Sequence, residues 1–480
     1  MASDNPTSLD PDDWGAFRAR AHETLDRALD HMQGARDGRV WTPVPEDVRQ
    51  SLNSPLPRSP GDADTAMTDI LPHGVGNTHP RFFGWVHGSG TPAQILPAMV
   101  EAAMNANCGG RDHVGLLVER QVITWMAELF GFPSCAGGLV VSGTSMATLI
   151  ALKAARDAAL GGASRSDGLS AAKLVGYTSS EAHSCVARAF DMLGLGTTAL
   201  RRVPVNGAFE MDIGGLQQAI EADRQAGLTP FCIIATAGTV NTGAIDDLAA
   251  IADIASEAGL WLHVDGAFGA CAQTAPALAP RLKGIDRADS LAFDFHKWMH
   301  VTYDAGCVLF RDQAMQAAAF ANRPDYLAGD TRGLAAGAPW PVDLGPELSR
   351  GFRALKVWAQ LREFGTDRLG SLIQRNCDQA AYLGARIDER DTLERLAPVS
   401  LQIVCFRVRP TGMDNNNLDD FNREVVIQLQ ERGLAAPSTT RIQGKLAIRV
   451  NITSHRTSKE DLDGLLDDLI DVSRQLAEGG

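Results

Sequence analysis

The chain has 480 residues, which is too long for one compact core, so two or three lobes are expected. It is 45% hydrophobic and 21% charged, the composition of an ordinary globular protein. A formal net charge of −14 argues against a surface that binds nucleic acid or an anionic membrane.

An N-terminal arm is predicted over residues 1–85. Asp10 followed by Pro11 provides an N-cap and a proline at the first helical position. The helix that follows carries an apolar stripe at helical spacing, made of Trp14, Phe17, Ala21, Leu25, Ala28 and Met32. Prolines recur from residue 41 to residue 61 and predict an extended segment. An amphipathic helix on such an arm needs a partner surface, and we expect another subunit to provide it.

The middle of the chain, residues 86–350, alternates apolar strands with helices. Strands are predicted at 138–141, 173–177, 231–236, 260–265, 290–293 and 307–310, and helices at 147–159, 213–225 and 248–258. Continuous apolar strands separated by helices indicate an α/β domain with a mostly parallel sheet covered on both faces. Such sheets bind ligands at the carboxyl ends of their strands, so chemistry is expected in the loops after Val141, Thr236, Asp265 and Phe293.

A smaller α+β domain is predicted over residues 351–480. Its hydrophobic periodicity indicates helices at 351–364, 418–432 and 458–476 and strands at 401–408 and 445–453. Thr457 and Glu460 have the spacing of a capping box at the start of the last helix.

Cysteine usage indicates a reducing compartment. The eight cysteines are scattered singly, without a C-x-x-C pair or metal-ligand spacing. We therefore expect buried, reduced thiols, no metal site and a cytoplasmic protein. Residues 3–13 are polar and do not resemble a signal peptide, and no apolar run approaches the length of a membrane span.

Lys297 is the first candidate for chemistry. It lies in Phe293-Asp-Phe-His-Lys-Trp298, directly after a predicted strand. Enzymes that use pyridoxal 5′-phosphate (PLP) need such a lysine, because its amine holds the cofactor aldehyde as a Schiff base. Partial desolvation is expected to lower the pKa of Lys297, so that neutral amine is present to react. A salt-bridged surface lysine is the alternative for this residue taken alone.

Asp265 is the second candidate, in the segment His263-Val-Asp-Gly-Ala267 at the end of another strand. PLP accepts electrons while its ring nitrogen is protonated, and a buried carboxylate beside that nitrogen keeps it so. The small residues Gly266 and Ala267 would let the ring approach. A helix-capping aspartate is the alternative reading.

Two more strand ends carry polar groups. The segment 142–148, Ser-Gly-Thr-Ser-Met-Ala-Thr, would begin a helix and offer N–H groups and hydroxyls to a phosphate, although it is neither a G-x-G-x-x-G nor a Walker A motif. His183, in Ser180-Glu-Ala-His-Ser184, is placed to stack on a cofactor ring or to exchange protons. Taken alone, the first is a plain N-cap and the second a satisfied loop histidine.

Together these elements resemble the group II PLP-dependent amino-acid decarboxylases, a fold-type-I family that includes aromatic-L-amino-acid, glutamate, histidine and diaminobutyrate decarboxylases. The resemblance runs from His79-Pro-Arg-Phe-Phe83 to Ser454-His-Arg-Thr457. Its most specific parts are the segments 180–183, 261–265, 296–298 and 348–358. It implies a fold-type-I PLP-dependent transferase-like fold and loss of the α-carboxylate of an L-α-amino acid.

The resemblance also implies roles for individual residues. Lys297 would carry the cofactor, Asp265 would pair with its ring nitrogen, and His183 would stack over the ring. Groups around the phosphate would be Thr144, Ser145, His296 and Asp294. Thr239 and Ala267 would line the cofactor face, and Arg449 would bind the substrate carboxylate.

The lid before the Phe-Arg-x-Leu-Lys helix departs from the family pattern. Members that simply decarboxylate place a tyrosine there, which protonates the carbanion. In this chain the lid over 324–340 offers Tyr326, early in the loop, as the candidate. Relatives without that tyrosine release an aldehyde, ammonia and peroxide, so oxidative decarboxylation with deamination stays open. His183 or a group of a partner subunit is the other candidate for the proton.

The substrate wall departs as well. Trp85, in Gly84-Trp-Val-His-Gly88, favours an aromatic substrate such as tryptophan, tyrosine, phenylalanine or DOPA. His87 and the segment 108–113 with His113, the latter from a neighbouring subunit, would suit a polar or acidic amino acid of the glutamate or diaminobutyrate type. Aromatic amino acids are the first expectation.

The family acts as dimers with shared active sites, so we expect a homodimer that binds a small amino acid. An aminotransferase would share the lysine, the aspartate and the phosphate loop, but is not expected to carry the segments 180–183 and 350–358 in this form. A noncatalytic PLP-binding regulator would need a DNA-binding segment, and we see none. The missing glycine fingerprints disfavour a nucleotide-binding module.

Overall fold

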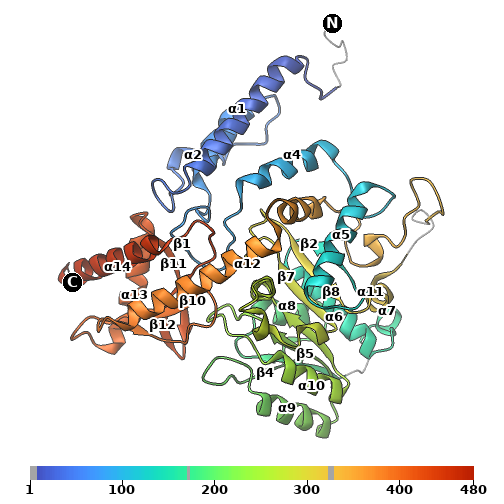
Figure 1. Cartoon of the computed structure of the whole chain (residues 1–480). Coiled ribbons are helices and arrows are strands. Elements are labelled where there is room, and N and C mark those ends of the chain that lie inside the picture. Colours follow the sequence, from blue (N-terminus) through green and yellow to red (C-terminus); the bar gives the residue numbers. More distant parts are fainter. Residues whose placement is uncertain (1–7, 170–172, 323–328, 480) are drawn as a thin grey trace.

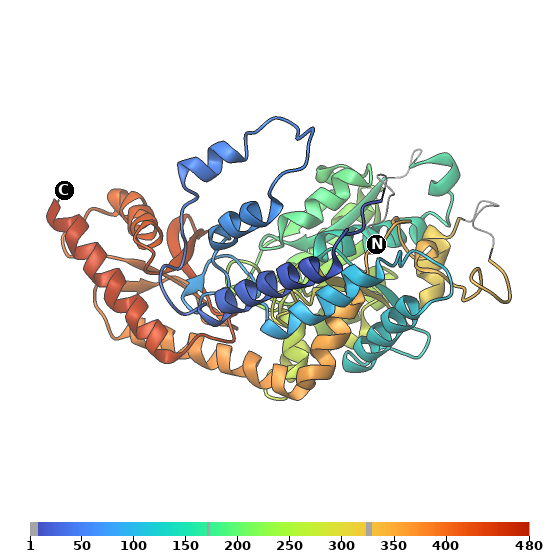
Figure 2. The same ribbon diagram turned by 90° about the horizontal axis from the view of Figure 1, so that it is seen from above.

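The computed structural model describes residues 8–169, 173–322 and 329–479. Figure 1 shows two sheets at opposite ends of the body, with helix α12 (Arg353–Asp388) running between them and helix α1 (Trp14–Gln33) projecting away from both. Figure 2, seen from above, shows α12 leading along one edge of the molecule into the C-terminal part. Non-helical dihedral angles at Gly365 (φ 67°) divide α12 into two helical segments.

The larger sheet has the strand order β2-β8-β7-β6-β5-β3-β4. Its strands are β2 (Gly137–Val141), β3 (Leu174–Ser179), β4 (Leu200–Val203), β5 (Thr229–Thr236), β6 (Trp261–Asp265), β7 (Ser290–Asp294) and β8 (Gly306–Phe310). Strands β4, β3, β5, β6 and β7 pair in parallel, whereas β8 is antiparallel to β7 and β2. The predicted α/β fold with a mostly parallel sheet is confirmed, and the carboxyl ends of β2, β3, β5, β6 and β7 meet at one edge.

Helices cover both faces of this sheet, as its continuous apolar strands require. One face packs on α6 (Thr144–Ala159), α8 (Ser184–Met192) and α11 (Gln313–Phe320). The other packs on α5 (Val114–Leu129), α9 (Ile213–Gln225), α10 (Leu248–Ala258) and the start of α12. The short helix α7 (Ser164–Asp167) follows α6.

The smaller domain has a five-stranded sheet of order β1-β11-β12-β10-β9. Its strands are β1 (Phe82–Phe83), β9 (Leu393–Arg395), β10 (Ile403–Val408), β11 (Ala436–Ile442) and β12 (Lys445–Asn451), packed with α13 (Asn415–Glu431) and α14 (Lys459–Gly479). Strand β1 comes from the N-terminal arm and pairs in parallel with β11. Our division at residues 85/86 and 350/351 therefore stays a proposal, since the arm is part of this sheet.

Two predicted helix caps are wrong by a few residues. Helix α1 begins at Trp14, because the Asp13 carboxylate accepts hydrogen bonds from Gly15 N and Ala16 N. The capping box of α14 is formed by Ser458 and Asp461, because the hydroxyl of Thr457 donates to the Pro80 carbonyl. In both places a competing polar residue a few positions along the chain makes the cap.

The rest of the arm contains α2 (Glu46–Ser51) and α3 (Ala63–Ile70), and α4 (Ile95–Met104) follows at the start of the larger domain. Helix α1 has no fully buried side chain, and the first half of its apolar stripe, Trp14, Phe17 and Ala21, is exposed in the single chain. Within the described ranges, no helix combines the length and the apolar character that a membrane crossing requires.

Candidate active site

A cavity of about 510 Å³ lies where the strand ends of the larger sheet meet. Asp265 ends β6, Asp294 ends β7, Thr144 begins α6 after β2, and His183 caps α8 after β3. Ten of the predicted site residues line this cavity: Trp85, His87, Thr144, Ser145, His183, Asp265, Ala267, Asp294, His296 and Lys297. The expectation that chemical groups gather at this sheet edge is confirmed.

Lys297 is held between two carboxylates. Its Nζ lies 2.8 Å from Asp294 Oδ2, and Trp298 beside it is fully buried, with Nε1 donating to Asn376 Oδ1 over 3.0 Å. Burial opposes the charged amine, but the attraction of Asp294 and Asp265 outweighs it, so the pKa of Lys297 is raised. The expectation of a lowered pKa is therefore wrong for the free lysine, because desolvation is not the only influence on it.

Asp294 links this lysine to the start of α6. Its Oδ1 accepts a hydrogen bond from Thr144 N over 2.7 Å, while its Oδ2 pairs with Lys297. A carboxylate at a helix N-terminus is stabilised by the helix dipole. An ionised carboxylate has no hydrogen to donate to a phosphate oxygen. The expected place of Asp294 around the phosphate therefore stays a prediction.

Asp265 is buried and lines the same cavity as the lysine. Its Oδ1 accepts from Ala267 N over 3.2 Å, and Oδ2 lies 3.8 Å from the Cys185 thiol. Burial raises the pKa of Asp265, and the nearby Lys297 charge partly offsets this. The neighbouring glycine serves packing, because a Cβ at Gly266 would lie 2.5 Å from the Cβ of Ala270.

His183 presents one ring nitrogen to the cavity. Its Nδ1 accepts a hydrogen bond from Cys185 N over 3.2 Å and so caps α8. In the neutral ring this makes Nε2 the protonated nitrogen. The side chain is exposed at the cavity wall, where it can contact a planar ligand.

These groups fit PLP. The hydroxyl of Thr144 is buried and without a hydrogen-bond partner among the described residues, at a helix N-terminus suited to a phosphate. The amine of Lys297 and the buried carboxylate of Asp265 line the same cavity. Phosphate donors, an amine for the aldehyde and an acceptor for a protonated ring nitrogen are the three features that the cofactor requires.

Three predicted residues lie outside the cavity lining. Thr239 holds its own loop, with its hydroxyl 2.9 Å from that of Thr242. His113 caps α5 by accepting from Gly115 N. Arg449 is buried and donates to the carbonyl of Trp85 over 2.9 Å. Their assigned contacts with cofactor or substrate stay predictions, and Tyr326 lies outside the described residues.

Arg449 acts on the cavity through Trp85. Trp85 has a left-handed backbone (φ 49°), which is strained for a bulky residue. The Arg449 guanidinium holds its carbonyl, and the Ser438 hydroxyl lies 3.3 Å from its amide nitrogen. Burial lowers the pKa of Arg449 to about 10. Two strands of the smaller domain thus fix a wall residue of the cavity.

Sequence reasoning missed Tyr303. It lines the cavity from the connection between β7 and β8, six residues after Lys297. The sequence offered one indication, which is that Tyr303 lies in the same loop as the candidate lysine, Lys297. The sequence prediction considered only the tyrosine of the lid.

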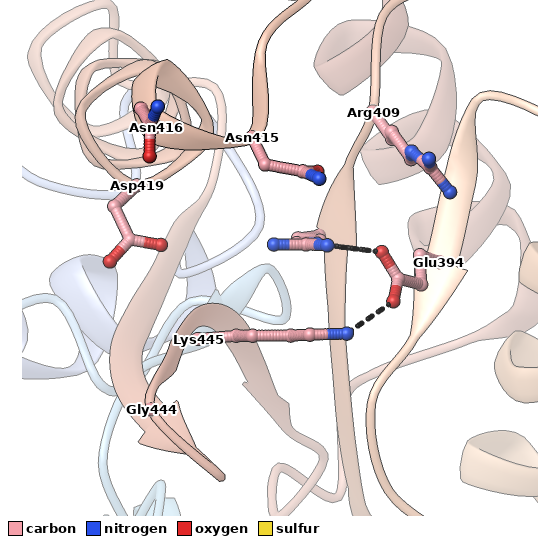
Figure 3. A pocket seen from close by; sticks show the side chains of 8 residues that line it. Glu394, Arg409, Asn415, Asn416, Asp419, Gly444 and Lys445 are labelled. Carbon is pink, nitrogen blue, oxygen red and sulfur yellow. Dashed lines mark hydrogen bonds and ion pairs between the residues drawn. The ribbon is translucent and has the colours of Figure 1, made fainter.

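A second hollow, of about 500 Å³, lies in the smaller domain (Figure 3). Its lining is charged, with Glu394 accepting from Lys445 over 2.9 Å and from Arg407 over 2.7 Å. These charges satisfy one another, and the lysine there is already paired. We therefore place the chemistry in the cavity at Lys297.

The fold and this cavity define a PLP-dependent enzyme of fold type I. The family model described as the pyridoxal-dependent decarboxylase conserved domain matches residues 45–409. The chain belongs to this family, so it is a decarboxylase with PLP as its cofactor.

Its relatives match over nearly the whole chain. An aromatic-L-amino-acid decarboxylase of Bacillus atrophaeus is 32% identical over 93% of this chain and 93% of its own. Tyrosine decarboxylase 3 of Petroselinum crispum is 29% identical over 96% and 94%. A crystal structure of Oryza sativa TDC with PLP and tryptamine superposes with a TM-score of 0.90 at 25% identity, covering 98% of this chain and 100% of that one.

Proposed function

We propose that the protein decarboxylates an aromatic L-α-amino acid to the corresponding amine. The observation that carries this proposal is the wall of the Lys297 cavity. Trp85 and His87 lie with ring centroids 6.0 Å apart, and Tyr303 continues the series 5.9 Å from His87. Such a wall suits a flat apolar side chain. The names of the relatives, which act on aromatic amino acids, support it.

The residues contribute binding, orientation and proton control. PLP, when bound, draws electrons from the bond between Cα and the carboxylate. Lys297 would hold the cofactor through its amine. Asp265 would keep the ring nitrogen protonated, and His183 would contact the ring. Thr144 and Ser145 at the start of α6 bind the phosphate, with His296 beside them.

The proton that replaces the carboxylate needs a donor. Tyr326 of the predicted lid is our candidate. Arg449 stays our candidate for the substrate carboxylate, with Thr239 and Ala267 along the cofactor and His113 from the second subunit.

We also propose that the protein is a homodimer. Helices α1, α4 and α5 carry exposed apolar side chains, which we call together the N-terminal apolar surface: Trp14, Phe17, Leu96, Met99, Val100, Met104, Val114 and Leu117. An apolar surface of this extent favours association, and a C₂ dimer is the commonest solution. We propose that a second copy of this chain covers the surface. Residues 108–113, which lie directly before α5, would then contribute to the partner's cavity.

A cytoplasmic location is the remaining proposal. All eight cysteines are free thiols, and six of them are buried. Free thiols are typical of proteins kept in a reducing compartment. Fractionation of the producing cells, with the protein detected by antibody, tests it.

The reaction is tested with purified, PLP-loaded protein and a panel of L-amino acids. Carbon dioxide, amine, aldehyde and peroxide are followed together. We expect carbon dioxide and a stoichiometric amine from aromatic amino acids. Aldehyde with peroxide would redirect the product assignment to the oxidative reaction. Turnover of glutamate or diaminobutyrate alone would overturn the aromatic assignment.

A further inference from the structure

Tyr303 stands in the loop between β7 and β8, at the wall of the Lys297 cavity. Its side chain is half exposed, and it lines the same cavity as Lys297. Its ring packs on His296 with centroids 4.3 Å apart and planes at 33°, and meets His87 edge-on. The backbone at Gly88 packs closely on the backbone of His296 and Lys297. A side chain would not fit there, because a Cβ at residue 88 would lie 2.3 Å from both of their carbonyl oxygens.

The start of α12 fixes the backbone of Tyr303. Lys356 Nζ donates to the carbonyl of Tyr303 over 3.1 Å and to that of Thr302 over 3.3 Å. Arg353 Nε donates to Asp304 Oδ1 over 2.9 Å. The Phe-Arg-Ala-Leu-Lys segment at 352–356 therefore has a defined task, which is to hold the loop that carries Tyr303.

The hydroxyl of Tyr303 has a proton that it can donate to a ligand, while the backbone N–H of Gly88 lies close to its oxygen. Burial raises the pKa of the Tyr303 phenol, although the Lys297 charge acts in the opposite direction, so the phenol is protonated at neutral pH and can donate. No side chain of the described ranges hydrogen-bonds its oxygen. The Lys297 amine and the Asp294 carboxylate act on this phenol electrostatically, whereas Val86, Val240 and Phe268 add apolar side chains to the lining of the same cavity.

We propose that Tyr303 determines specificity by hydrogen-bonding a hydroxyl group on the aromatic ring of the substrate. The inference rests on the proposed function and narrows it to amino acids with a hydroxylated ring. A site that hydrogen-bonds a substrate hydroxyl discriminates against the analogue without it, because its own polar group then stays unpaired. L-Tyrosine is thus preferred over L-phenylalanine.

The variant Tyr303→Phe tests this, because it keeps the ring contacts and removes the hydroxyl. We expect kcat/KM for L-tyrosine to fall about tenfold, the loss of one hydrogen bond of roughly average strength, with L-phenylalanine unchanged. Tyr177→Phe is the matched control, since its phenol is fully buried and donates to Asp223 outside the cavity. This control is expected to leave the ratio of the two substrates as in the wild type.

Binding of the product amines provides a second measurement, independent of turnover. Calorimetry on the PLP-loaded protein is expected to show tighter binding of tyramine than of phenethylamine, and Tyr303→Phe to abolish that difference. An equal loss for both substrates, or an unchanged preference for L-tyrosine, would overturn the inference while leaving aromatic decarboxylation intact. If the wild type decarboxylates no aromatic amino acid, the proposed function and this inference both fail.

Discussion

Asp294 accepts a hydrogen bond from Thr144 N with one carboxylate oxygen and lies 2.8 Å from Lys297 Nζ with the other. The pair keeps the lysine charged in the free protein, since the pKa of Lys297 is raised. Only the neutral amine reacts with an aldehyde. If Lys297 holds the cofactor, as we propose, its capture would require removal of this proton, and Asp294 would control how readily the proton leaves.

The variant Asp294→Asn is expected to lower the pKa of Lys297, because it removes the adjacent negative charge and leaves burial, which favours the neutral amine. The amide oxygen can still accept from Thr144 N. The rate at which protein freed of cofactor captures PLP, followed by absorbance, is then expected to reach half its maximum at a lower pH than in the wild type. An unchanged or higher midpoint would contradict the role assigned to Asp294.

His263 gives the fold a dependence on pH. It is fully buried on β6, with Nδ1 2.9 Å from Ser290 Oγ, and burial lowers the pKa of His263 to about 3. In the unfolded chain His263 becomes protonated near pH 6.5, whereas the buried ring stays neutral down to about pH 3. The contribution of the neutral ring to the free energy of unfolding is therefore complete above pH 6.5 and is lost as the pH falls towards 3. The difference corresponds to roughly 5 kcal/mol.

We expect His263→Gln to lose this dependence. Its amide can replace the hydrogen bonds of the neutral ring but does not titrate. The denaturation temperature of the variant, measured by calorimetry, is expected to fall less steeply between pH 6.5 and 4 than that of the wild type. Parallel curves would show that His263 does not contribute.

The gathering of the principal candidate residues in one cavity could be predicted from the sequence, because each lies at or shortly after the end of a buried strand. Lys297, Asp265 and His183 needed no tertiary information beyond the rule that parallel strands end at one edge. Tyr303 could not be placed in this way. Its ring contacts arise where the loop after Lys297 folds back on His296 and on His87.

Arg350 joins three elements in front of α12. Its guanidinium pairs with Glu119 of α5 at 2.6 Å and donates to the carbonyls of Val140 in β2 and Cys108. Both charged side chains are buried, with 2% of Arg350 and 6% of Glu119 exposed. The pair thus fixes the segment before α12 against α5 and β2.

The variant Arg350→Met is expected to destabilise the protein by about 3–5 kcal/mol, because it leaves the Glu119 charge buried without its partner. Urea denaturation measures this loss. Adding Glu119→Gln removes the unpaired charge, so the double variant is expected to recover part of the lost free energy of unfolding. A single variant as stable as the wild type would mean that the pair holds no part of the fold in place.

Prediction of the elements succeeded where an apolar run was long and continuous. Strands β2, β3, β5, β6, β7 and β8 are such runs. Strand β4 was not predicted, because it lies at the sheet edge and carries Arg201 and Arg202 in its centre. Strand β1 was not predicted, because its partner, β11, is more than 350 residues away along the chain. A local sequence pattern does not reveal such a distant pairing.

At the scale of the molecule, the arm and the N-terminal apolar surface account for the proposed dimer. Met99 on α4 is 52% exposed and Leu96 beside it 63%. Side chains of this kind lose contact with water when a second copy packs on them. Assembly is therefore expected to depend on this face.

The variant Met99→Glu is expected to shift the protein from dimer to monomer in analytical ultracentrifugation, because it places a charge in the apolar contact. Ile427→Glu is the control, since Ile427 is an exposed apolar residue on α13, in the smaller domain. A dimer that resists Met99→Glu as it resists the control would place the interface elsewhere.

The location of the cofactor is tested most directly by chemical reduction. Borohydride added to the PLP-loaded protein fixes the cofactor on the lysine that holds it, and peptide mass spectrometry identifies that residue. We expect the label on Lys297 alone, and none on the Lys297→Ala variant, which is also expected to release no carbon dioxide from aromatic amino acids. A label on another lysine, or full activity of the variant, would contradict the account.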